Sequence, residues 1–465
     1  MFDYYNIISV KKNFHFVIKP SSRSQARMVL YEKASKKIYM FGGVCQGRTN
    51  ELWKCDIIRH YKSNSLFFNN EKPKIKLSFQ WNQIESNSKK PAKRTGHSMI
   101  LYKDDLIIYG GIINEEETYE SRNDILFYNI PSDVFTIKSF NGRLTPPWRR
   151  NHIAELIGKY MVIFGGIEEN IIDNRMRFLN DFWVLNLAKY TWAKIKTVGD
   201  SIPPLHSMSS CVILYSLHKQ DESLTPFKLP ILPESIQQSN IETEGIYIFG
   251  GIDEKRRCTN SLYILKISRP NQVIQLNLNG KPPFPRIGCS MHYYSKLNVI
   301  ILFGGKNESV TNGGGYFNDF WFIDLEMKQW VRMDTDVGLQ SRADHSSVIY
   351  DDFIIIFGGT NGQYYHKSEM LIANLHLIRN EDVDCSTSKH EIVKTSERLN
   401  PLKIKEESPE SRNSRRSKDY FSWDDPERGI AHKYYETFHL KSKDIESKMN
   451  DIYIESNNYT PNQFS

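Results

Sequence analysis

Short runs of β-branched and aromatic residues recur along the chain, and six of them end in two consecutive glycines. The glycine pairs are Gly42 and Gly43, Gly110 and Gly111, Gly165 and Gly166, Gly250 and Gly251, Gly304 and Gly305, and Gly358 and Gly359. The first glycines of successive pairs are 68, 55, 85, 54 and 54 residues apart. A repeat of this length, with insertions, predicts the blades of a β-propeller.

A second apolar run precedes each of these runs, and a phrase of the type Arg-x-x-His introduces it. The phrase is clear at Arg94–His97, Arg149–His152 and Arg342–His345. It is weaker at Arg286–Cys289 and Arg23–Ala26, and nearly lost at His206–Ser209.

A third run follows each glycine pair after a polar loop, and a fourth run carries a bulky residue. The clearest third runs are Asn180–Leu187 and Asn318–Leu325; the others begin at Asn50, Asn123, Asn260 and Ser368. The bulky residues of the fourth runs are Trp81, Phe135, Trp192 and Trp330, with Val273 as a weak substitute. Glycine permits the positive φ and the close approach that such strand ends require. Because a four-stranded repeat cannot bury both faces alone, the copies are expected to stack in a ring.

Over residues 13 to 378 this pattern resembles the kelch family. The resemblance implies an all-β fold, a six-bladed β-propeller of four-stranded antiparallel blades. The sixth repeat ends after Met370–Leu375 without a fourth strand. We expect Asn13–Ile18, at the other end, to supply it and so to close the ring.

The predicted domains are an N-terminal extension at 1–12, the propeller at 13–378 and a charged tail at 379–465. The tail is predicted to be largely disordered, with a helix at 426–453 suggested by the spacing of its apolar residues. That helix could dock on the propeller, self-associate, hold a partner or have no role. Long insertions are expected as loops at 58–76, in the first blade, and at 217–244, in the fourth.

The net charge of +7 is unevenly distributed. The tail has 15 Lys and Arg against 17 Asp and Glu, a net of −2, which leaves +9 for the rest of the chain. This modest excess favours acidic partners and does not predict nucleic-acid binding. The six cysteines are irregularly spaced, which is typical of a reducing compartment. No signal peptide and no run of about 20 apolar residues is visible, so a cytoplasmic protein is expected, with the nucleus left open.

The loop before the first strand and the loop after the second should emerge on one face of the ring. The first set of loops would place the arginines of the repeated phrase there: Arg23, Arg94, Arg149, Arg286 and Arg342, with Arg150 beside them. The second set adds Arg48, Arg122, Arg175, Arg177, Arg256 and Arg257, with Tyr119, Phe178, Tyr316, Tyr364, Tyr365 and His366. Arginines suit the recognition of carboxylates or phosphates. In the alternative interpretation the repeated arginines bond blade to blade and the loop arginines are simply solvated.

The predicted function is a non-catalytic scaffold or adaptor that binds another protein through this face. The resemblance to kelch substrate adaptors implies an acidic or C-terminal peptide as the ligand. The alternatives are a substrate receptor of a cullin-type ubiquitin ligase, a trafficking or cytoskeletal kelch protein, and an enzyme with an active site on a propeller loop. We expect no cofactor and no metal, because His97, His152 and His345 occupy equivalent points of different blades. The oligomeric state is left open.

Overall fold

The computed structural model describes residues 19–33, 35–62, 74–113, 124–140, 144–169, 175–214, 244–266, 270–310, 315–333, 339–366 and 370–375. All of these except Leu375 belong to one compact unit. They form six mainly antiparallel sheets, one for each glycine pair, and one small two-stranded sheet.

The first three sheets each have four strands. In order along the sheets, the strands are β1 (Arg27–Tyr31), β2 (Lys37–Phe41), β3 (Leu52–Lys62) and β4 (Lys74–Ile84); β5 (Ser98–Tyr102), β6 (Asp105–Tyr109), β7 (Ile125–Asn129) and β8 (Val134–Lys138); and β9 (Ile153–Ile157), β10 (Tyr160–Phe164), β13 (Phe182–Asn186) and β14 (Thr191–Ile195). A small hairpin of β11 (Ile167–Glu169) and β12 (Met176–Phe178) lies in the loop after β10.

The fourth sheet has a short extra strand, and the sixth shows three strands within the described residues. The fourth sheet consists of β16 (Ser209–Ile213), β17 (Gly245–Phe249), β18 (Leu262–Lys266) and β19 (Gln272–Leu276), with β15 (Val198–Gly199) parallel to β19. The fifth consists of β20 (Ser290–Tyr294), β21 (Val299–Phe303), β22 (Phe320–Asp324) and β23 (Gln329–Met333). The sixth consists of β24 (Ser346–Tyr350), β25 (Phe353–Phe357) and β26 (Met370–Asn374).

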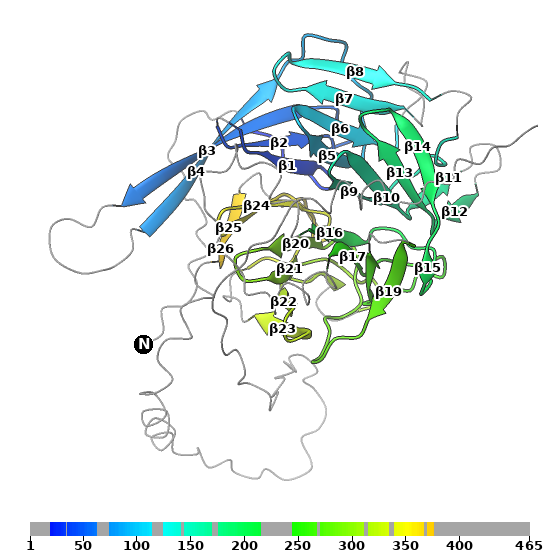
Figure 1. Cartoon of the computed structure of the whole chain (residues 1–465). Helices are drawn as coiled ribbons and strands as arrows, with labels where there is room; N and C mark the ends of the chain where they lie inside the picture. The colour runs from blue at the N-terminus through cyan, green and yellow to red at the C-terminus, as the bar shows by residue number, and fades with distance from the viewer. Residues whose placement is uncertain are drawn as a thin grey trace, which may run out of the picture. The chain divides into compact units, whose positions relative to one another are not determined.

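The first strand of each sheet lies beside the first strand of the next sheet, and the series closes on itself. The neighbours are β1 and β5, β5 and β9, β9 and β16, β16 and β20, β20 and β24, and finally β24 and β1. The six sheets therefore stand as blades around a common axis (Figure 1). The predicted six-bladed propeller of antiparallel blades is confirmed.

A set of backbone hydrogen bonds encircles the axis just before the inner strands. The residues involved have positive φ and occupy one equivalent position in the six blades: Gln25, Gly96, Asn151, Ser207, Gly288 and Asp344. From the third blade on, each N–H donates to the equivalent carbonyl of the preceding blade, at 2.8–3.2 Å. Gln25 N–H donates to the Asp344 carbonyl at 2.8 Å, so the described first and last blades are joined by the same bond.

The glycine pairs form the second set of bonds between blades. The N–H of each second glycine donates to a backbone carbonyl of the next blade at 2.8–3.1 Å; the acceptors are Arg94, Arg149, Leu205, Arg286, Arg342 and, across the closure, Arg23. A Cβ on the first glycine of a pair would lie only 2.2–2.9 Å from that same carbonyl oxygen. Both glycines also have positive φ, which side chains disfavour. The repeated Gly-Gly is thus required by the contact between neighbouring blades.

The hydrophobic core lies between the faces of adjacent blades. Aromatic residues of the third and fourth strands fill these spaces, as Trp53 and Trp81 do between the first and sixth blades. Trp183 and Trp192 lie between the second and third blades, and Trp321 and Trp330 between the fourth and fifth. Residues of this size match the wedge-shaped gap between twisted sheets.

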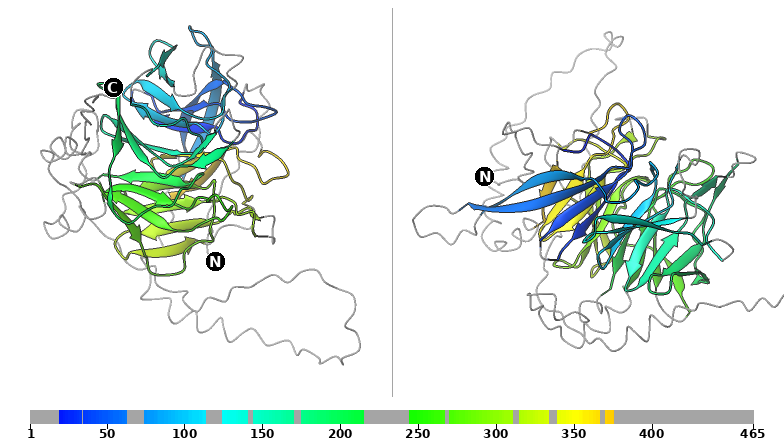
Figure 2. Two further views of the ribbon diagram at one scale, coloured as in Figure 1. Left: turned by 90° about the vertical axis from the view of Figure 1, so that its right-hand side faces the viewer. Right: turned by 90° about the horizontal axis from the view of Figure 1, so that it is seen from above.

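The insertion predicted as a loop at 58–76 is partly strand, so that prediction was wrong at its edges. β3 and β4 have 11 residues each and extend beyond β2 as a two-stranded arm (Figure 2). Alternate residues of the arm, Ile57, Ile75 and Phe79, pack against the core between the first and sixth blades. Arg59 also forms an ion pair with Asp351 at 2.7 Å and lies over the Tyr350 ring.

Several predictions concern residues outside the described ranges: the closing strand at 13–18, the tail with its helix at 426–453, and nearly all of the 217–244 insertion. No helix in the described part of the chain has the length and apolarity needed to cross a bilayer.

Replacing Gly110 by Ala is expected to destabilise the propeller by about 2–4 kcal/mol, because the substitution combines positive φ with a backbone clash. The added Cβ would lie 2.3 Å from the Arg149 carbonyl oxygen. The matched control is Gly47→Ala, since nothing lies within 4 Å of a Cβ at Gly47. Urea denaturation of both variants measures the difference. Equal stability of the two would contradict this account of the glycine pairs.

Candidate functional site

The two loops predicted to share a face pair with each other in every blade. One residue of the Arg phrase and the residue after each glycine pair form an isolated β-bridge; the bridges are Ser24–Val44, Thr95–Ile112, Arg150–Ile167, His206–Ile252, Ile287–Lys306 and Ala343–Thr360. The surface formed by these loops, which we call the loop face, therefore contains both sets of predicted site residues.

The first arginine of each phrase is nevertheless buried. Arg149 and Arg286 have an exposed fraction of 0%. In the five blades that have this arginine, the Nη1 group donates to the carbonyl of the first glycine of the same blade; the pairs are Arg23–Gly42, Arg94–Gly110, Arg149–Gly165, Arg286–Gly304 and Arg342–Gly358, at 2.8–3.4 Å. The alternative interpretation gave these arginines a structural role but had them bond from blade to blade; their guanidinium groups instead bond within their own blade. Their contact with a partner stays a prediction.

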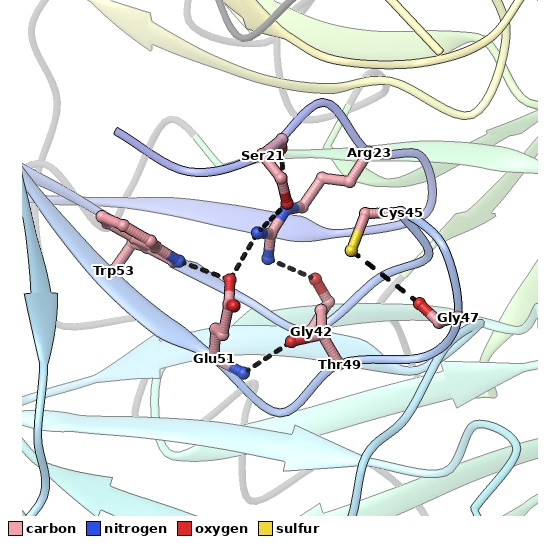
Figure 3. A network of polar contacts seen from close by, with 8 residues as sticks. All are labelled: Ser21, Arg23, Gly42, Cys45, Gly47, Thr49, Glu51 and Trp53. Atoms are coloured by element: carbon pink, nitrogen blue, oxygen red, sulfur yellow. Dashed lines mark hydrogen bonds and ion pairs between the residues drawn. The ribbon is translucent and has the colours of Figure 1, made fainter. Parts of the chain in front are cut away.

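Carboxylates of the residues directly before the third strands pair with three of these arginines. Figure 3 shows Arg23 paired with Glu51, at 2.5 Å, while the Trp53 indole donates to the same carboxylate oxygen at 2.9 Å. Arg286 binds Asp319 with two nitrogens, at 2.6 and 2.9 Å, and Arg149 binds Asp181 at 2.9 Å. Burial by itself would raise the pKa of Glu51, but the hydrogen bonds from Arg23 and Trp53 outweigh it and lower that pKa.

The histidines of the Arg-x-x-His phrase are packed at the contacts between neighbouring blades. His97, His152 and His345 each lie edge-on against the aromatic residue that ends the second strand of the preceding blade: Phe41, Tyr109 and Phe303. Burial, and then the neighbouring arginine, lowers the pKa of all three well below the usual value. The described residues contain no group of three or more His, Cys, Asp or Glu placed to hold a metal ion.

A different set of basic residues occurs at the loop-face bridges. In the third, fourth and fifth blades one member of the loop-face bridge is Arg150, His206 or Lys306. Burial and then the charges of Arg150 and Lys306 lower the pKa of His206 to about 4. The two cations therefore lie close enough to His206 to act on its charge. We call these three residues the cationic arc.

Of the three residues in the cationic arc, Arg150 has the least complete side-chain hydrogen bonding among the described residues. Its Nε atom is buried without a hydrogen-bond partner, and its Nη2 reaches only the sulfur of Met176, at 3.9 Å. Lys306 forms an ion pair with Glu308 at 3.4 Å and also interacts with Asp344. Burial raises the pKa of Asp344, although Lys306 and Arg27 act against this.

The loop arginines predicted as partner-binding residues differ in their contacts and exposure. Arg177 pairs with Glu168, and Arg257 pairs with Asp253 at 2.7 Å. Arg48 and Arg256 are exposed. Arg122, with Tyr119, lies outside the described residues.

The predicted aromatic residues Tyr316 and Tyr364 lie on the loops of the fifth and sixth blades. Tyr364 is 47% exposed, and the Tyr316 ring lies against the backbone at Gly362. Sequence reasoning missed Lys306 and the nearby Phe284 and Phe317. Its position could have indicated Lys306, because it directly follows a glycine pair. The equivalent residue in the third blade is Ile167, which forms the bridge with Arg150.

The closed ring of blades, the glycine pairs and the buried arginines define a kelch-type β-propeller. The family model for the KLHDC2/KLHL20/DRC7 Kelch-repeats domain matches residues 62–219 and 235–397, which is more than half of the chain, so the protein belongs to the kelch-repeat family. The predicted resemblance is thereby confirmed.

Several known proteins are similar to the chain in sequence. It is 23% identical over 334 residues to human Kelch domain-containing protein 3, covering 70% of this chain and 75% of that protein. It is 24% identical to the Drosophila melanogaster leucine-zipper-like transcriptional regulator 1 homolog, covering 60% of this chain but only 26% of the relative. The solved structure of YjhT matches with a TM-score of 0.50 and 13% identity, over 77% of this chain and 99% of YjhT, which shows the fold alone.

Arg286→Met is expected to cost about 3–5 kcal/mol of stability, because it leaves the Asp319 carboxylate partly buried without its cation. The control Arg257→Met removes an exposed ion pair and should cost less than about 1 kcal/mol. Chemical denaturation of both variants tests the structural role. A small, equal effect would show that the repeated arginine is not needed by the fold.

The buried histidines predict that stability falls in mild acid. The folded-state pKa values of His206, His292 and His366 are lowered to about 4, mainly by burial, from a usual value of 6.5. The unfolded chain therefore binds more protons between pH 6.5 and 4, so the stability present above pH 6.5 is lost as the pH falls through this window. Glu155, whose pKa burial raises to about 7, acts in the opposite direction.

Urea denaturation at several pH values measures this dependence. His292→Gln should reduce its slope between pH 6.5 and 4, whereas His60→Gln, at an exposed position, should leave it unchanged. Stability that is constant from pH 7 to 5 would contradict the prediction.

Proposed function

We propose that this protein is a non-catalytic interaction module that binds an acidic segment of another protein on the loop face, at the cationic arc. In this role it acts as a scaffold or adaptor. The ligand is an acidic or C-terminal peptide, since guanidinium and ammonium groups recognise carboxylates through charged hydrogen bonds.

One observation carries the proposal: the cationic arc departs from the repeat. The bridge residues of the first, second and sixth blades are uncharged, namely Ser24 and Val44, Thr95 and Ile112, and Ala343 and Thr360. The ring forms in those blades without a basic residue at this point. Arg150, His206 and Lys306 are therefore not required by the blade, in contrast to the buried arginines.

The electrostatics of the arc support the same conclusion. Burial and then the charges of Arg150 and Lys306 lower the pKa of His206. Both cations therefore act at one place on the loop face, where they would also attract a bound anion. Perturbed groups of this kind are typical of functional sites.

The test compares the charge-reversal pair Arg150→Glu and Lys306→Glu with a control pair, Lys103→Glu and Lys159→Glu. The control lysines lie in the turns β5–β6 and β9–β10, at the opposite end of the inner strands. Proteins captured from cell lysate by the full-length chain are quantified for each form. We expect arc-dependent partners to be depleted about tenfold or more by the arc pair and unaffected by the control pair, because two charge-assisted contacts are lost.

Thermal unfolding of each variant checks that the propeller remains folded. Capture of the same partners by the wild type and the arc pair would refute the proposal. Binding at the arc should also weaken as salt rises.

A further inference from the structure

An aromatic patch lies next to the cationic arc, and it suggests what else the ligand carries. The patch consists of Phe284, Tyr316, Phe317, Tyr364 and Tyr365, from loops of the fifth and sixth blades. Building on the proposed function, we infer that the loop face recognises a peptide in which a large apolar or aromatic side chain lies within about two residues of a carboxylate.

The part of the patch on the fifth blade is held rigidly. Phe284 and Phe317 are parallel, with an interplanar angle of 4° and ring centroids 6.3 Å apart. The guanidinium carbon of Arg286 lies 4.1 Å from the Phe317 centroid. Because Arg286 is itself fixed by Asp319, Phe317 is fixed by a buried cation. Phe284 nevertheless remains 50% exposed.

The part on the sixth blade is anchored by its loop. A Cβ at Gly362 would lie 3.0 Å from the Tyr316 ring, so the ring of the fifth blade lies against the backbone of the sixth. Tyr364 packs edge-on against His366. His366 is buried and bonded through Nε2 to the Ser341 carbonyl at 2.8 Å. The patch therefore spans two blades and is ordered before any ligand arrives.

The exposure of these rings is what indicates a binding surface. Nine large hydrophobic side chains are exposed among the described residues, and three of them, Phe284, Tyr364 and Tyr365, belong to this patch. A single exposed apolar residue is ordinary, but grouped aromatic residues are typical of the centres of protein interfaces.

Lys306 connects the patch to the cationic arc. Its backbone pairs with that of Tyr316, and its Nζ lies 5.9 Å from the Tyr316 ring centroid. An extended peptide advances about 3.3 Å per residue. A carboxylate at Lys306 and a side chain that packs on Tyr316 can therefore come from residues one or two positions apart.

The test measures binding of fluorescein-labelled synthetic peptides to the full-length chain by anisotropy. The parent peptide has a Trp between Asp residues and a free C-terminus. Three derivatives replace the Trp by Ala, replace the Asp residues by Asn, or amidate the C-terminus. The last two distinguish side-chain from terminal carboxylates as the source of the anionic group.

The protein variants separate the two parts of the site. Phe284→Ala with Tyr364→Ala should weaken the parent peptide about tenfold and leave the Trp-to-Ala peptide unchanged. The control Met327→Ala, an exposed apolar residue in the β22–β23 turn, should change neither. Arg150→Glu with Lys306→Glu should weaken both peptides.

Equal affinity for the parent and the Trp-to-Ala peptide would overturn the aromatic inference, while sensitivity to the arc pair would still support the proposed function. Failure of every peptide to bind at millimolar concentration would also overturn the inference. The lysate capture comparison then judges the proposed function separately.

Discussion

The hydrogen bond from the second glycine of each pair to the next blade's backbone carbonyl is the contact on which the ring depends. It occurs at all six blade contacts, including the closure from Gly359 to Arg23. The arginine side chain adds a second bond within its own blade, to the first glycine. The fourth blade shows which of the two bonds is essential, because Leu205 supplies the backbone carbonyl there and has no guanidinium group. The ring therefore requires the backbone bond, and five arginines reinforce it.

This constraint separates residues that serve the repeat from residues free to vary. Arg149 and Arg150 are adjacent in the chain, yet Arg149 is bonded to Gly165 and Asp181 whereas Arg150 has a buried Nε without a partner. The first arginine serves the repeat through these bonds, although its Nη2 also has no hydrogen-bond partner among the described residues. The second binds the ligand in the proposed function, and its equivalents in other blades include serine, threonine and alanine. Specific recognition in this fold is thus expected where the copies differ.

The sequence predicted the blades well because their signals are local: short apolar strands, glycine pairs and a bulky fourth strand. It left the role of the repeated arginines open, since a recurring arginine suits either structure or binding. An acid that follows the asparagine of the third run, as in Asn180-Asp181 and Asn318-Asp319, indicates a structural role for the arginines that pair with it. The arm was missed because its alternating Ile57, Arg59 and Tyr61 lie within a Lys- and Asn-rich stretch. The stacking of Phe284 on Phe317 depends on loop conformation, which no periodicity reveals.

The same arginine contact also links the scaffold to the site. Arg286 is fixed by Gly304 and Asp319 as part of the ring, and its outer side supports Phe317. Lys306 follows the glycine pair of the same blade and adjoins Tyr316. A ligand that touches the Phe317 side of the aromatic patch would therefore rest on groups whose positions are set by bonds within the fifth blade. Because these groups are already held in place, recognition here would need little rearrangement, and preorganisation of this kind lowers the entropic cost of binding.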